Sequence, residues 1–307
     1  MLRYNCKKIV AGLVACMCIA SSYLSTTLFA APQSPDVAVT VGVQQNENNG
    51  VNWTKGSAAD ITAMGIGLAP ENAGARGEAL ARRAAMVDAY RNLAEIIQGV
   101  QIDSDTLMED LIVTSDTVNA SVSALVKGAT IIAEGPNYDG SYYVMMSVPL
   151  YGKKSLASVA LAEVSRNLRY EDFEEVEETT LPKKEVRAIR KSAYTGVVVD
   201  ADDLGLEPTF APVIYDTNGR IVYGLQNLDY DLAVSKGMVG YANELFDATS
   251  GSRAGDNPLV VKAVEVKGGK NSVNKVNVVV SVEDADRILL ANEKSGMLEN
   301  LAVVFVK

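Results

Sequence analysis

The stretch that decides the fold runs from Arg76 to Gly99 and reads RGEALARRAAMVDAYRNLAEIIQG. Ala, Leu, Arg and Glu dominate it, and all four favour helices. At about 100° per residue it divides into two faces. The apolar face collects Ala79, Met86, Tyr90, Leu93 and Ile97, and the polar face collects Asp88, Arg91, Asn92 and Glu95. The pattern predicts an amphipathic helix over 76–98 that packs on an apolar layer, with Gly99 as its C-terminal cap.

Strand patterns surround this helix. Gly65-Ile66-Gly67 indicates a tight turn from a strand into the helix. It does not fit a dinucleotide fingerprint, because the third glycine and the following βαβ unit are missing. The remaining patterns predict strands at 61–68, 130–134 and 142–150 and helices at 113–127 and 153–168. We therefore expect an α+β domain over 59–169.

A second domain is expected over 193–307, after a charged linker at 170–192. The linker is acidic over 171–178 and basic over 183–191, with a helix after Pro182. It is typical of a solvated connector, and the alternative is a basic docking helix for an acidic partner. The predicted strands are 195–200, 213–216, 220–223, 259–266, 276–282 and 301–306, with one helix at 283–292. The fold class is therefore α+β in two domains, each with a small, mostly antiparallel sheet packed by helices.

The first 30 residues have the layout of a signal peptide. Arg3, Lys7 and Lys8 supply the positive region, and 9–20 is apolar. Leu28-Phe29-Ala30 before Ala31 has the small residues typical of a signal-peptidase cleavage site. We expect export to the periplasm or outer membrane and cleavage between Ala30 and Ala31. Residues 31–58 are expected to form a flexible lead with at most one strand, at 37–43.

All three cysteines, Cys6, Cys16 and Cys18, fall inside this segment. Leu13-Val14-Ala15-Cys16 also has the pattern of a lipobox. Two interpretations remain open: Cys16 carries a lipid that tethers the protein to a membrane, or it is an ordinary residue of the apolar region.

The composition argues against most catalytic chemistry. The chain has no histidine, and a product cut near Ala31 has no cysteine, so His- and Cys-ligated zinc and Ser-His or Cys nucleophiles are excluded. The net charge of −10 does not suit nucleic acid. The acidic runs 200–203 and 216–219 are interpreted as turns, because they lack the ligand spacing of a calcium loop. We expect no catalytic, cofactor-binding or metal-ligating residues.

Three segments carry a family resemblance: 64–67, the helix segment 81–95 with its Ala-Tyr-Arg-Asn-Leu-Ala-Glu end, and 99–102. Together they resemble the LPP-twenty (LPP20) lipoprotein family, and they are similar to the N-terminal domain of flagellar assembly protein T. The resemblance implies an envelope protein near the outer membrane, in a family with many lipoproteins, some members of which belong to flagellar basal structures. It supplies no catalytic residue.

The expected function is a non-enzymatic assembly or scaffold role at the outer membrane, linked to flagellar basal structures. Its partners would be envelope proteins or a cell-wall polymer, with a lipid as membrane tether and no nucleic acid. The alternative is a module that binds an envelope polymer or small ligand at the face between the two domains. A carboxylate-based hydrolase is a third hypothesis, although no pair of acids is singled out.

Overall fold

The computed structural model describes residues 49–307 except 167 and 270–273. The signal segment with Cys16, Ala30 and Ala31, and the predicted strand at 37–43, lie outside the described residues. No helix among the residues that are described is long and apolar enough to cross a membrane.

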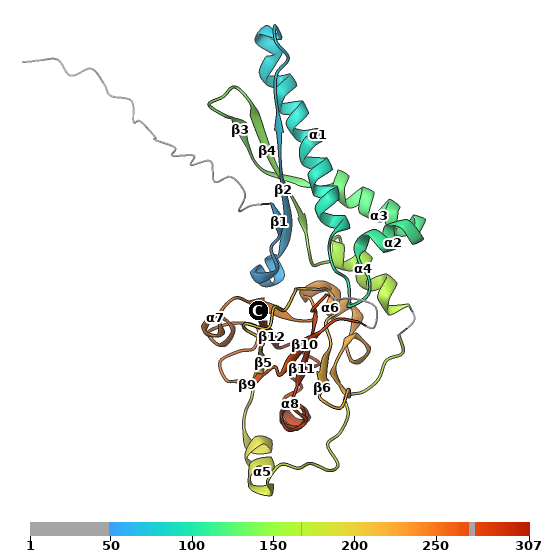
Figure 1. Ribbon diagram of the computed structural model, residues 1–307, viewed down its shortest axis with the longest axis vertical. Helices are drawn as coiled ribbons and strands as arrows, with labels where there is room; N and C mark the ends of the chain where they lie inside the picture. The colour runs from blue at the N-terminus through green and yellow to red at the C-terminus, as the bar shows by residue number, and fades with distance from the viewer. Residues whose placement is uncertain (1–48, 167, 270–273) are drawn as a thin grey trace, which may run out of the picture. The chain divides into compact units, whose positions relative to one another are not determined.

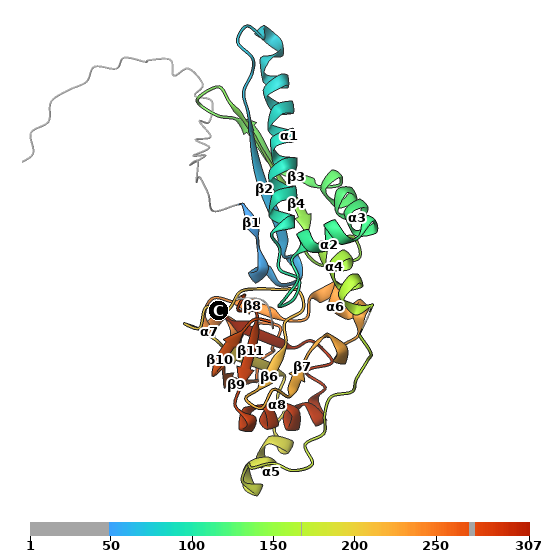
Figure 2. The same cartoon turned by 45° about the vertical axis from the view of Figure 1, so that its right-hand side comes forward.

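The first module is an antiparallel sheet with helices (Figure 1). Its strand order is β1-β2-β4-β3, and the long helix α1 runs along one face of the sheet in Figures 1 and 2. The antiparallel hairpin and the long helix predicted from sequence are confirmed. The elements are β1 (Gly50–Val51), η1 (Trp53–Ala58), β2 (Asp60–Gly67), η2 (Gly74–Arg76), α1 (Gly77–Gln98), α2 (Met108–Thr114), α3 (Asp116–Lys127), β3 (Thr130–Pro136), β4 (Tyr142–Pro149) and α4 (Leu156–Ser165).

The buried face of α1 differs from the predicted one. Leu93 and Ile97 are buried as expected, but Ala79 is exposed and Met86 and Tyr90 are only half-buried. Small residues one turn apart, Gly77, Ala81, Ala85 and Ala89, fill the rest of the buried face.

The cause lies in β2, which contains Gly65 and Gly67. A Cβ atom added at Gly65 would overlap backbone atoms of Ala85 and Ala89, and one added at Gly67 would overlap the backbone of Ala81. The two glycines therefore let the helix backbone lie directly on the strand, where only alanine fits beneath the helix. The prediction that they form a turn is wrong, because they belong to the strand itself.

Polar side chains of α1 cover the edge of β2 beyond the short strand β1. Asp88 Oδ2 accepts from the Ile66 amide at 3.0 Å, and the Asn92 side chain donates to the Met64 carbonyl at 2.8 Å. Asn49 Oδ1 accepts from the Met64 amide at 2.7 Å. These side chains take over the hydrogen bonds that a neighbouring strand would make.

Asp60 opens β2 with a dense set of contacts. Its carboxylate accepts from Asn52 at 2.8 Å, Lys55 at 3.0 Å and Ser147 at 2.9 Å. Burial raises the pKa of Asp60, but these hydrogen bonds outweigh burial and hold the pKa below its usual value.

The second module contains two four-stranded sheets. One has the order β8-β12-β5-β9 and is parallel throughout. The other has the order β10-β11-β6-β7 and is mixed, with β11 and β6 parallel. The elements are β5 (Gly196–Asp200), β6 (Ile214–Asp216), β7 (Ile221–Tyr223), η3 (Leu225–Asn227), α6 (Tyr230–Lys236), β8 (Gly240–Ala242), α7 (Leu245–Thr249), β9 (Pro258–Lys262), β10 (Glu265–Lys267), β11 (Asn277–Val280), α8 (Val282–Ser295) and β12 (Val303–Val306).

The α+β class with two domains is thus confirmed, but the second module departs from the expected antiparallel arrangement. Its first sheet is parallel, with β12 and most of β5 buried on both faces, as parallel sheets usually are. Five of the six predicted strands are present, but the single strand predicted at 259–266 is wrong, because the chain leaves one sheet after β9 and enters the other at β10. The elements α6, β8 and α7 were not predicted.

The charged linker lies against the second module over much of its length. Phe173 stacks on Tyr223 with 6.3 Å between ring centres, and Val176 and Leu181 are buried. The basic helix α5 (Lys183–Lys191) is joined to α8 by ion pairs, including Arg190–Glu293 at 2.9 Å. The linker is therefore packed on the second module over much of its length, whereas the sequence predicted a solvated connector.

An aromatic cluster joins the two modules, whose described residues belong to one compact unit. The Trp53 ring in η1 packs edge-on against Phe210 at 5.1 Å and Tyr241 at 5.8 Å between ring centres. Tyr151 also packs on Phe210, at 5.9 Å. Phe210, Tyr151 and Tyr241 belong to one continuous buried core, and Trp53 packs against it. A pocket of about 450 Å³ remains between the modules beside this cluster, lined by Thr54, Lys55 and Gly56 and by residues of the second module that include Tyr241 and Arg253.

Candidate binding groove

Cys16, Ala30 and Ala31 lie outside the described residues. Lipidation and cleavage at these positions therefore stay predictions.

The two acidic runs form turns whose carboxylates bind backbone amides. Asp200 Oδ1 accepts from the Asp202 amide at 3.2 Å, and Asp203 has a φ of 64°. Asp216 Oδ1 accepts from the amides of Asn218 at 2.8 Å and Arg220 at 2.9 Å. No group of three or more acidic, Cys or His side chains positioned for a metal occurs in the described part of the chain.

Two buried carboxylates share one guanidinium. Arg220 Nε lies 2.9 Å from Asp216 Oδ2, and its Nη2 lies 2.8 Å from Asp286 Oδ1. Thr179 of the linker donates to the second oxygen of Asp286 at 2.6 Å. Burial lowers the pKa of Arg220, but the bonds to Asp286 and Asp216 outweigh burial and raise the pKa. The network ties the linker, β6 and α8 together, and its charges are satisfied internally.

Arg253 is another cation held by the fold. Its guanidinium donates to the Gly237 carbonyl at 2.8 Å and to the Lys236 carbonyl, at the C-terminal end of α6. Burial lowers the pKa of Arg253. The side chain therefore caps the C-terminal end of α6.

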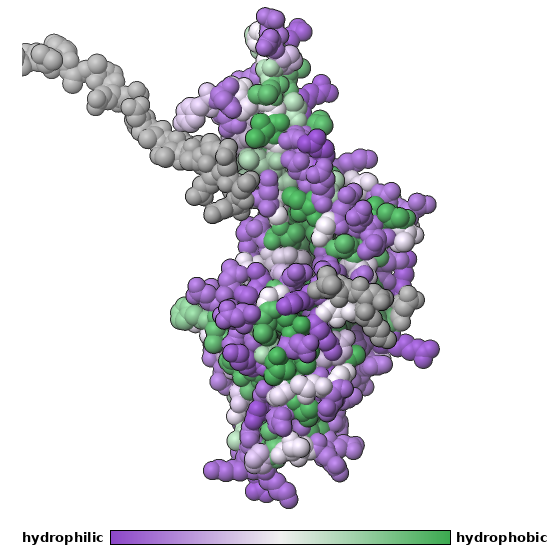
Figure 3. Space-filling model, viewed as in Figure 1, coloured by the Kyte–Doolittle hydropathy of each residue, from purple (hydrophilic) through white to green (hydrophobic). Residues whose placement is uncertain are grey.

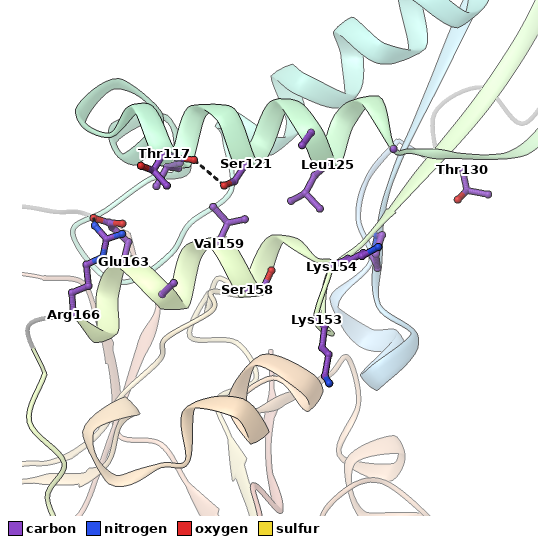
Figure 4. A pocket seen from close by; sticks show the side chains of 15 residues that line it. Thr117, Ser121, Leu125, Thr130, Lys153, Lys154, Ser158, Val159, Glu163 and Arg166 are labelled. Atoms are coloured by element: carbon purple, nitrogen blue, oxygen red, sulfur yellow. Dashed lines mark hydrogen bonds and ion pairs between the residues drawn. The ribbon is translucent and has the colours of Figure 1, made fainter.

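A groove between α3 and α4 is the candidate site (Figure 4), with a volume of about 880 Å³. Both helices are fixed from below, since Val118 and Val122 of α3 and Leu156 and Leu161 of α4 are buried in the core. The lining residues are Thr117, Val118, Ser121, Ala124, Leu125, Gly128, Thr130, Pro149, Lys153, Lys154, Ser158, Val159, Ala162, Glu163 and Arg166.

The floor of the groove is mainly aliphatic. Leu125 of α3 and Val159 of α4 extend toward each other across it (Figure 4) and are only partly buried. The nearest hydroxyls are satisfied within their own helices: Ser121 donates to the Thr117 carbonyl at 2.8 Å and Ser158 to the Ser155 carbonyl at 2.7 Å. The floor therefore offers apolar contact to a ligand.

The two ends of the groove differ in charge. Glu163 and Arg166 form an ion pair of 2.7 Å at one end, while the exposed Lys153 and Lys154 lie at the other (Figure 4). Among the described residues, no carboxylate lies within ion-pair distance of either lysine. One end is thus a local cationic site on an acidic protein.

The lysines are held there by the turn that precedes α4. Gly152 has a φ of 111°, and its amide donates to the Val234 carbonyl of α6 at 2.9 Å. Ser155 donates to the Gly152 carbonyl at 2.6 Å and caps α4 by accepting from the Ser158 amide at 3.3 Å. The intervening Lys153 and Lys154 belong to this turn, and their side chains are exposed to solvent. The sequence contains a lysine pair directly before a serine that caps a helix. This pattern alone does not predict a site, because it does not indicate that α3 lies beside α4.

Family comparisons agree with this division into modules. The two matched segments coincide with the two modules of the fold. Residues 56–148 match the model of the LPP20 lipoprotein family, which confirms the resemblance predicted from the helix motif. Residues 196–307 match the model of the second domain of Treponema pallidum Tp0624. A search of curated proteins finds no match. The α3 side of the groove falls within the LPP20 match, whereas α4 and the lysine pair fall between the two matches.

Proposed function

We propose that this protein is a non-enzymatic assembly or scaffold protein of the cell envelope, associated with the outer membrane. The observation that carries the proposal is the aromatic joint between the modules, where Trp53 packs against Phe210 and Tyr241. A joint of this kind holds two modules at a constant spacing, which suits a protein that positions partners.

The surfaces support binding more than chemistry. The candidate groove offers an aliphatic floor and one cationic end, and its serine hydroxyls donate to backbone carbonyls. A nucleophile needs a base that accepts its proton, and these hydroxyls have carbonyl partners in place of a base.

The LPP20 match supports a place at the envelope. The more specific setting is proposed from the sequence resemblance of the helix segment to the N-terminal domain of flagellar assembly protein T alone. We propose that the partners are envelope proteins of flagellar basal structures. A lipid on Cys16 would be the membrane tether.

A deletion strain tests the role. Loss of the gene should cause an envelope or motility defect that the wild-type chain restores, while the purified protein releases no fragments from peptidoglycan. Robust peptidoglycan hydrolysis by the pure protein would refute the proposal. Intact-mass analysis of protein from native membranes tests the tether, because a diacylglyceryl group on Cys16 and a free N-terminus near Ala31 differ in mass.

The cationic end of the groove favours a second candidate, a module that binds an anionic envelope polymer. Titration calorimetry with cell-wall fragments separates the two functions. Heat that disappears when Lys153 and Lys154 are replaced would support polymer binding, and absence of heat would count against it.

A further inference from the structure

We propose that the α3–α4 groove binds an acidic amphipathic helix of a partner protein, with the C-terminal end of that helix at Lys153 and Lys154. The inference rests on the proposed scaffold function and names the kind of partner that the groove accepts.

The dimensions of the groove fit a short helix. Its walls are α3, with 12 residues, and α4, with 10 residues. At 1.5 Å per residue these walls are roughly 15–18 Å long, which is the length of a helix of about 10–12 residues. A third helix laid along two neighbours buries its apolar stripe between them, as in known helix-in-groove complexes.

The floor matches such a stripe. Leu125, Val159 and Ala162 line the groove and remain partly accessible to solvent. Leucine side chains at i, i+3 or i+4, and i+7 of a partner helix would cover them. A purely polar anionic polymer would leave this aliphatic surface in water, so the floor favours an amphipathic peptide.

The charges set the direction of the helix. The C-terminal end of a helix carries partial negative charge, and acidic side chains in its last turn add to it. Lys153 and Lys154 supply unpaired positive charge at one end only, since Arg166 is paired with Glu163 at the other. The acidic end of the partner therefore lies at the lysine pair.

The chain's own exposed amphipathic helix is not the occupant. α5 is strongly basic and is engaged with α8 through Arg190–Glu293 and Glu185–Arg287, at 2.9 and 2.8 Å. Its charge has the wrong sign for the lysine end of the groove.

The test is a fluorescence-anisotropy titration of the full exported chain with three labelled probes. The first is a helical peptide of about 12 residues with one leucine stripe and glutamates in its last turn. The second is the same peptide with lysines in its last turn, and the third is polyglutamate. The protein variants are the double change Lys153→Glu and Lys154→Glu, and the matched control Lys183→Glu and Lys184→Glu on α5, where both lysines are also exposed. Ala162→Glu tests the floor, with its fold checked by circular dichroism.

We expect the acidic peptide to bind the wild type and the α5 control equally. Binding should weaken about tenfold in the groove double variant, since two charges that attract the acidic end of the peptide are replaced by two that repel it. The lysine-ended peptide should prefer that variant, and Ala162→Glu should weaken both peptides. The inference is overturned if the wild type does not bind the acidic peptide, if the double variant binds it unchanged, or if polyglutamate binds as tightly.

This failure is distinct from failure of the proposed function. If the peptide does not bind but the deletion strain is restored by the groove double variant, the groove inference is wrong and the scaffold function stands. If the peptide binds while the pure protein degrades peptidoglycan, the groove inference stands and the scaffold function is wrong.

Discussion

Replacing Gly65 by alanine should strongly destabilise the first module, although it adds a single methyl group inside a strand. The new Cβ would lie 2.7 Å from the Ala89 Cα and still closer to the Ala89 amide nitrogen and the Ala85 carbonyl oxygen. Carbon atoms in contact are usually about 3.5–4.0 Å apart, so α1 would have to retreat by roughly 1 Å or more.

The size of the effect follows from what the retreat separates. The buried alanines of α1 would lose contact with β2, and overpacking of a tight core costs typically 1–3 kcal/mol, more when the backbone must move. Alanine gains about 0.5–1 kcal/mol over glycine in conformational entropy, which offsets part of this cost. We expect a net loss of about 2–3 kcal/mol, or roughly 4–6 °C in Tm for a chain of this size.

Differential scanning calorimetry and urea unfolding followed by circular dichroism measure this loss. The matched control is Gly99→Ala at the end of α1, where an added Cβ meets only carbonyl oxygens at 3.7 and 3.9 Å. This change should leave stability unchanged or raise it by up to about 1 kcal/mol. Ala89→Gly should not rescue Gly65→Ala, because the overlap involves backbone atoms. A Gly65→Ala protein as stable as the control would refute close packing of helix on strand.

Three further outcomes are expected. Trp53→Leu should lower the free energy of unfolding by about 2–3 kcal/mol through lost ring contacts. In the wild type, the fluorescence of this single tryptophan should change at the same temperature as the circular dichroism, and two separate transitions would contradict a shared core. Arg220→Met should lower the free energy of unfolding by about 3 kcal/mol, because the buried Asp216 and Asp286 would lose their cation; an unchanged free energy of unfolding in urea would argue against this role. The pKa of Asp60 is lowered in the folded protein, so its contribution to stability is fully present above the ordinary pKa of 3.8 and is lost as pH falls through the folded pKa. Asp60→Asn should therefore reduce the decline in the free energy of unfolding as the pH is lowered. An unchanged decline would show that Asp60 does not cause it.

The length of α1 could be predicted from sequence, but its buried face could not. Helical periodicity gave weight to Met86 and Tyr90, whose side chains are large and apolar. The fold instead selects Ala81, Ala85 and Ala89, because β2 approaches through its glycines. The strand predicted at 61–68 already contained Gly65 and Gly67, but the sequence did not show that α1 packs directly on that part of the strand.

Strand positions in the second module were largely predictable, while their pairing was not. β5 and β12 are continuous apolar runs. Parallel strands buried on both faces have this pattern, but other buried segments have it too, so it does not identify the partner strand. Choosing a partner requires knowing which distant segments meet. The groove was missed for the same reason: α3 and α4 could each be predicted as helices, but their adjacency is a property of the tertiary structure.

If the chain is exported as proposed, the central position of β12 imposes an order of events on its folding. β12 lies between β8 and β5 in the sheet. When the N-terminus crosses the membrane first, β5 and β8 reach the far side well before β12. Until residues 303–306 arrive, β5 and β8 have no strand between them and expose apolar faces to the surrounding envelope. The sheet of the first module is complete once β4 has crossed, so that module can fold early while the second waits. The interval between the two is when the chain is most open to chaperones and proteases.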